Sequence, residues 1–215
     1  MKNYSILFLV CFLSCKAQII DKYNPDNLGS FINGAYYKDV TNFRDQFVGT
    51  WLYTNGNTSL TIMLGKRDYL FDPGYNIHED IMVGAYKYIE NGVEKVNTLY
   101  QIDQSYGNNI SAYAANFYLY GDYFKPYPTN TPVCSECNVD ERRMLFSLAE
   151  PDKIPFGLGD HCLIIRRFTE NGVDKIKVWS YDYGNSLVLV DENDNPIQTQ
   201  IPNKLPLGEF ILIKQ

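Results

Sequence analysis

The segment Val48-Gly49-Thr50-Trp51-Leu52-Tyr53-Thr54-Asn55-Gly56 decides the fold class of this chain. Its β-branched and aromatic residues are typical of a strand, and Asn-Gly tolerates the positive φ angles of a tight type I′ turn. A second apolar run follows at 59–64. The pattern predicts two antiparallel strands, with Trp51 buried on the first.

Strand signals continue along the chain, of which 15% is aromatic. Asn-Gly recurs at 91–92 and 171–172, each time between two apolar runs, so we expect a hairpin at each. The sequences that flank these two turns align with each other at a shift of eighty residues. Either an ancient duplication or independent convergence on a favourable turn sequence would explain this similarity. The chain lacks a long amphipathic helix pattern. We therefore predict one all-β domain over 45–215, an antiparallel up-and-down barrel or strongly curled sheet of about 8–10 strands.

The Gly-Thr-Trp sequence at 49–51 resembles the Gly-x-Trp first strand of lipocalin-like barrels. The resemblance implies an eight-stranded barrel in which Gly49 lets the chain turn in tightly and Trp51 plugs one end. Near the chain end, Lys204 and Lys214 are available where that family has an arginine packed on the tryptophan. Gly49 and Trp51 are therefore the candidate barrel-closing residues.

The N-terminus has the layout of a secretory signal peptide. Lys2 precedes an apolar run at 6–13, and small residues follow. Eight apolar residues rise only about 12 Å as a helix, which is too short for a hydrocarbon core of about 30 Å. We expect residues 1–14 to direct export and to be removed.

Two cleavage sites compete at the end of this leader. Leu13-Ser14-Cys15 resembles a bacterial lipobox, and cleavage there would leave Cys15 as the acylated new N-terminus. Alternatively, an ordinary signal peptidase would cleave after Ala17 and release a chain that begins at Gln18. Residues 13–18 also resemble the leader end of small flavobacteria-type envelope lipoproteins of an uncharacterised family. That resemblance implies a lipid anchor in the outer membrane and no activity. We expect residues 15–44 to hold the lipidated Cys15 and an N-terminal tether.

The charge balance argues against nucleic acid as a partner. Loss of Lys2 leaves 18 basic and 25 acidic side chains, a formal net charge of −7. Arg142-Arg143 and Arg166-Arg167 are isolated pairs, whereas phosphate binding needs several converging cations. We expect both arginine pairs to be solvated. The expected partner is the membrane, which the protein would contact through its N-terminal lipid.

Three cysteines remain after the leader and Cys15 are set aside. Cys134 and Cys137 are the candidate disulfide, and two free thiols or a zinc site with His161-Cys162 are the alternatives. A strand beginning at His161 would turn those adjacent side chains to opposite faces, which disfavours zinc. We therefore expect no metal and no cofactor.

Enzyme motifs are missing from the sequence: it has no Gly-x-Ser-x-Gly elbow, phosphate loop or His-Glu-x-x-His. His78-Glu79-Asp80 is interpreted as a solvated polar turn. The aromatic stretch around Tyr118, Tyr120 and Tyr123 supplies candidate ligand-binding residues, or else buried strand aromatics.

We expect an envelope lipoprotein that binds a small apolar molecule or a glycan without catalysis. A structural or protein-interaction lipoprotein and a carboxylate-dependent hydrolase are the alternatives. An apolar cavity open to solvent would favour ligand binding inside the barrel, whereas an interior filled by side chains would not.

Overall fold

The computed structural model describes residues 17–27, 31–117, 119–126, 132–138, 141–149, 151, 161–182 and 204–215. Apart from the helix α1 (Ile110–Asn116) and three short 3-10 helices, Pro25–Asn27, Phe43–Phe47 and Leu99–Gln101, the described elements are strands. They are β1 (Ile19–Asp21), β2 (Tyr36–Lys38), β3 (Gly49–Asn55), β4 (Thr58–Asp72), β5 (Ile77–Glu90), β6 (Val93–Asn97), β7 (Leu119–Pro126), β8 (Arg142–Leu148), β9 (His161–Glu170), β10 (Val173–Asp182) and β11 (Gly208–Lys214).

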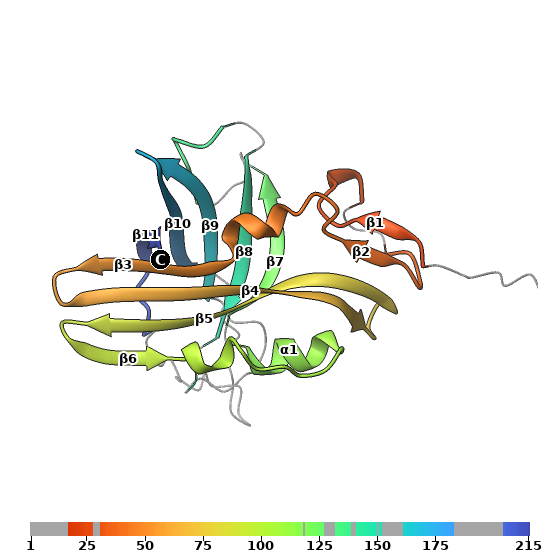
Figure 1. The fold of residues 1–215 in the computed structure, drawn as a ribbon, viewed down its shortest axis with the longest axis horizontal. Helices are drawn as coiled ribbons and strands as arrows, with labels where there is room; N and C mark the ends of the chain where they lie inside the picture. The colour runs from red at the N-terminus through yellow and green to blue at the C-terminus, as the bar shows by residue number, and fades with distance from the viewer. Residues whose placement is uncertain are drawn as a thin grey trace, which may run out of the picture.

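Eight of the described strands close into a barrel (Figure 1). Strands β3, β4, β5, β7, β8, β9, β10 and β11 each pair antiparallel with the next, and β11 pairs back with β3. The strands therefore follow one another around the barrel in chain order. This arrangement confirms the prediction of an all-β, antiparallel, lipocalin-like up-and-down barrel.

Of the three Asn-Gly dipeptides expected to form hairpin turns, those at 91–92 and 171–172 do so. Asn91 and Gly92 have φ angles of 50° and 82°, and the turn at 171–172 repeats this geometry. Two successive positive φ angles are the requirement of a type I′ turn. In the first hairpin Asn55 still pairs with Thr58, so the turn residues there are 56–57.

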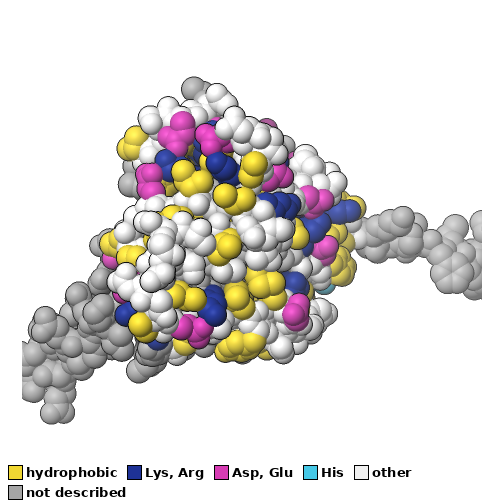
Figure 2. All heavy atoms as spheres, turned by 60° about the vertical axis from the view of Figure 1, so that its left-hand side comes forward, with side chains coloured by type: hydrophobic (Ala, Val, Ile, Leu, Met, Phe, Trp, Pro, Cys, Tyr) yellow, Lys and Arg dark blue, Asp and Glu magenta, His cyan; other side chains and the backbone are white. Residues whose placement is uncertain are grey.

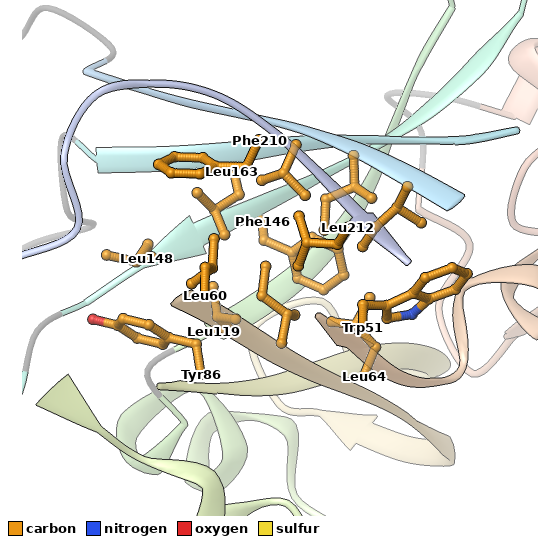
Figure 3. Packing of buried hydrophobic residues seen from close by; sticks show 14 of the residues in the cluster. Trp51, Leu60, Leu64, Tyr86, Leu119, Phe146, Leu148, Leu163, Phe210 and Leu212 are labelled. Carbon is orange, nitrogen blue, oxygen red and sulfur yellow. The ribbon is translucent and has the colours of Figure 1, made fainter. Parts of the chain in front are cut away.

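Large apolar side chains fill the inside of the barrel (Figure 3). They come from alternate positions of the strands, as the period of two along a strand requires. Each is at most 8% exposed, and they include Trp51, Leu60, Ile62, Leu64, Met82, Tyr86, Tyr88, Leu119, Met144, Phe146, Leu148, Leu163, Ile165, Ile176, Val178, Phe210 and Leu212. This described part of the interior is a packed core.

Trp51 is fully buried in this core and is linked to the 3-10 helix Phe43–Phe47. Its indole Nε1–H donates to the carbonyl of Phe47 at 2.8 Å, and the Lys214 ammonium lies 5.4 Å from the ring centre. Gly49 has a φ of 126°, and a Cβ there would lie 3.3 Å from Cε of Lys214. The strand can therefore begin in this way only with glycine, and Lys214 packs on the tryptophan as the lipocalin resemblance implies for an arginine.

Strands β4 and β5 continue past the barrel and carry β2 and β1 beside them (Figure 1). Ile20 and Tyr37 are buried there against Ile77 of β5. Strands β1 and β2, which lie in the segment expected as a tether over 15–44, are therefore folded onto the barrel domain, because their apolar side chains find partners on β5. On the outside of β4 and β5, α1 packs over a second apolar cluster.

Candidate functional site

Four aromatic side chains gather on one face of this extension, and we call them the aromatic face: Tyr36, Tyr69, Phe71 and His78. In the sheet register His78 pairs with Tyr36 of β2 and with Phe71 of β4, so the three form a row across neighbouring strands. The Tyr69 ring stacks on His78 at 4.1 Å between centroids and meets Tyr36 edge-on at 4.8 Å. Tyr69 is 49% exposed and the other three are half-buried. The rings therefore form a stacked surface open to solvent.

The backbone at Tyr69 is strained. The residue lies in a β-bulge between Arg67 and Leu70 and has a φ of 58°. That conformation costs a non-glycine residue roughly 1–2 kcal/mol. The carboxylate of Asp80 accepts the Tyr69 N–H at 3.0 Å and holds the bulge. Glycine or asparagine would fit this backbone with less strain, so the distinctive contribution of tyrosine is its exposed ring.

Asp80 lies beneath the aromatic face and is buried. Its Oδ1 accepts the Tyr36 hydroxyl at 2.6 Å as well as the Tyr69 N–H, and its Oδ2 accepts the Asp39 N–H and Arg44 Nη2, both at 3.0 Å. Burial and the hydrogen bond to Asp80 raise the pKa of Tyr36 above its ordinary value. Tyr36 therefore stays protonated and keeps donating to the carboxylate.

Arg44 is the buried cation of this network. Its Nε donates to Asp39 at 3.2 Å, Nη1 to the Ile81 carbonyl at 2.8 Å, and Nη2 to Asp68 at 2.8 Å and to Asp80. Burial acts to lower the pKa of Arg44, but the hydrogen bond to Asp68 and the charge of Asp80 outweigh it and raise the pKa above its ordinary value. The Asp39–Arg44–Asp80 network thus joins the 3-10 helix at 43–47, β4 and β5.

The network also corrects the interpretation of His78-Glu79-Asp80 as a solvated turn. The three residues lie in β5, where Asp80 is buried and Glu79 forms an ion pair with Lys22 at 2.6 Å. Residues from 36–44 supply the partners that make burial of Asp80 favourable. The carboxylate of Asp80 and the guanidinium of Arg44 are already occupied by hydrogen bonds within the protein, and these bonds hold the aromatic rings in place. The site is therefore suited to binding a ligand by stacking on the rings.

The predicted ligand-binding tyrosines do not all lie in the described part of the chain. Cys15 and Tyr118 are outside it, and Tyr123 is placed only through its backbone, which pairs with Leu145. Tyr120 is half-buried and packs against the apolar cluster between β5 and α1. The aromatic face is therefore built from residues that were not predicted as ligand-binding, and His78 among them was expected in a solvated turn.

A disulfide joins Cys134 to Cys137, and this loop packs on Ile164 and Trp179 outside the barrel. Arg143 is buried beside it: its Nη1 donates to the Pro132 carbonyl at 2.9 Å and its guanidinium lies over the Trp179 ring. The expectation that the Arg142-Arg143 pair is solvated is therefore wrong for Arg143. Bonded cysteines are not metal ligands, and within the described ranges there is no cluster of three or more side chains suited to a metal ion.

His161 and Ser180 form a second buried polar pair, at the end of the barrel opposite Trp51. The His161 Nε2 and Ser180 Oγ atoms are 2.6 Å apart, and both residues point inward from β9 and β10. They are 4% and 3% exposed. A serine nucleophile must reach its substrate, and both of these side chains are almost fully buried, so the pair is suited to a structural role.

Comparison with known proteins places the chain in a family without giving it an activity. No curated protein and no solved structure matches it. Within the described residues no helix is long and apolar enough to cross a bilayer. The profile of DUF6705, a family of unknown function, matches residues 1–215 in full. The chain therefore belongs to the DUF6705 family.

Proposed function

We propose that this protein is a lipid-anchored protein of the cell envelope that binds a glycan on its aromatic face. The leader at 1–14 and the lipobox-like Cys15 support export and acylation. Lys16 supports the outer membrane, because it is not the aspartate that commonly retains lipoproteins in the inner membrane. Several acyl chains together provide stable anchoring where one would be marginal.

The observation that carries the binding proposal is the exposed, stacked Tyr69 ring held by a strained backbone. An aromatic ring offers an apolar surface to the C–H face of a sugar, and a tyrosine hydroxyl offers a polar edge. Asp68 precedes Tyr69 and is largely exposed, and Lys38 is exposed on the same side of β2 as Tyr36. Charged groups beside flat rings are suited to sugar hydroxyl groups.

The barrel interior is less suited to a ligand. Its described side chains are large, apolar and at most 8% exposed, so a small apolar molecule would have to displace packed core atoms. Binding on the surface avoids that cost. We therefore favour the aromatic face over the interior as the site.

Replacing Tyr69 by alanine tests the site. The soluble Cys15→Ser chain is titrated by calorimetry with tetrasaccharides of N-acetylglucosamine, glucose and mannose. We expect binding of at least one of them, weakened roughly 2–10-fold by Tyr69→Ala, because an aromatic stack contributes about 0.5–1.5 kcal/mol. The matched control is Tyr100→Ala, which removes a tyrosine that is 66% exposed outside the aromatic face. Equal binding by the wild-type and Tyr69→Ala chains would exclude the site, and binding of none of the three sugars would count against a glycan ligand.

A further inference from the structure

Exposed apolar side chains lie at the end of the extension, and we call them the tip patch: Phe31 and Ile32 before β2, Tyr75 in the β4–β5 turn, and Ile19 at the start of β1. Each is at least 47% exposed. Phe31 and Tyr75 stack with ring centroids 4.0 Å apart. The loop holding Phe31 is fixed to the β4–β5 turn, because the Gly34 N–H donates to the Asn76 carbonyl at 2.8 Å. The patch is therefore held in place by backbone hydrogen bonds and ring stacking.

The chain enters the fold at the same end. Strand β1 is parallel to β2, and β2 is parallel to β5, so β1 begins beside the β4–β5 turn. The Gln18 carbonyl accepts the Tyr36 N–H at 2.8 Å, which holds the entering segment against β2. The first described residues thus lie next to the tip patch.

This position limits the distance between the patch and the anchor. Our inference rests on the proposed acylation of Cys15, which is four residues before Ile19. Four extended residues span at most about 14 Å. A lipid at Cys15 therefore keeps the tip patch close to the headgroup region.

The chemistry of the patch suits that region. Aromatic and aliphatic side chains enter the boundary between headgroups and acyl chains, to a depth of about 5–10 Å for amphipathic surface helices. The amides of Asn33 and Asn76 lie among these side chains and bond to each other. The charge of Lys22, close to this end in sequence, is paired with Glu79 at 2.6 Å. Contact between the tip patch and the membrane would therefore depend more on burial of apolar side chains than on attraction to anionic lipids.

The other end of the long hairpin has a different surface. Strand β5 runs from the tip patch to the turn at 91–92 and has 14 residues. At about 3.3 Å per residue, the strand is roughly 45 Å long. Ion pairs Lys87–Glu94 and Lys95–Glu90 flank Val93 at that turn. Figure 2, with the turn end brought forward, shows acidic and basic side chains side by side among apolar ones.

We propose that the tip patch docks on the surface of the bilayer that holds the acylated Cys15, with the turn at 91–92 directed away from it. The β4–β5 extension then acts as a foot for the barrel. The aromatic face lies on one side of this foot and opens just above the headgroups, where envelope glycans would meet it.

Two tryptophan reporters test this orientation. Tyr75→Trp places the reporter in the tip patch and Val93→Trp places it at the far turn, and the native residues are similarly exposed at 56% and 59%. The native Trp51 and Trp179 are buried in both chains and give a common background. Each full-length chain is purified after export, its intact mass is measured, and it is reconstituted in phosphatidylcholine vesicles with or without brominated acyl chains.

We expect an acylated chain in which brominated lipid quenches the Tyr75→Trp reporter and shifts its emission to the blue, while the Val93→Trp reporter is unaffected. Quenching of neither reporter in an acylated chain would overturn the docking and leave the anchor standing. Equal quenching of both would overturn the orientation. A chain without acyl groups would overturn the anchor and the docking together.

Discussion

Replacing Arg44 by methionine is expected to lower the free energy of unfolding by about 3–5 kcal/mol, because removal of one partner leaves buried charges uncompensated. Arg44, Asp39 and Asp80 have side chains no more than 3% exposed. Methionine retains most of the apolar stem but donates no hydrogen bond. Urea unfolding of the Cys15→Ser chain with and without Arg44→Met measures the loss.

Two further variants separate buried charge from other effects. Lys66→Met removes a partly exposed cation that pairs with Asp45, and it should change stability by less than about 1 kcal/mol. Adding Asp80→Asn to Arg44→Met should restore part of the loss, since it removes one of the unpaired carboxylates. If Arg44→Met were as stable as Lys66→Met, the Asp39–Arg44–Asp80 network would not hold the extension to the barrel.

Trp51→Ala is expected to cost about 3–5 kcal/mol, as large-to-small changes of buried aromatic residues do. The Trp51 side chain is fully buried, and its loss would open a cavity and leave the Phe47 carbonyl without its donor. Thermal unfolding followed by circular dichroism should show a lower midpoint. Trp51→Phe should lose less, because it retains a ring and removes mainly the hydrogen bond.

Lys214→Met is the matched control for the cation above the tryptophan. The ammonium lies 5.4 Å from the ring centre, and such a contact at an exposed position contributes about 0.5–1 kcal/mol. We therefore expect a small change from Lys214→Met and a large one from Trp51→Ala. A Trp51→Ala chain as stable as the wild type would mean that this residue does not close the barrel.

The local parts of the fold could be predicted because short segments encode them. Gly49 and Trp51 mark the first barrel strand, since the φ of 126° at residue 49 requires glycine. The dipeptides at 91–92 and 171–172 mark hairpins through the positive φ angles that they tolerate. Alternation of apolar residues then predicts which side chains face the core.

The candidate site could not be predicted because distant residues build it. Asp80 looks like part of a polar turn until Tyr36 and Arg44 supply its hydrogen-bond partners across more than thirty residues of chain. The exposure of Tyr69 depends on a bulge that no sequence motif marks. For the same reason residues 15–44 were predicted to hold a tether, although Ile20 and Tyr37 bury their side chains against β5.

We propose above that this member of the DUF6705 family works from a lipid anchor at the cell envelope. Intact mass of the full-length protein, expressed in a Gram-negative host and extracted in detergent, tests it most directly. We predict the mass of residues 15–215 plus acyl groups for the wild type, and loss of those groups in Cys15→Ser. A soluble product beginning at Gln18 in both chains would contradict the claim.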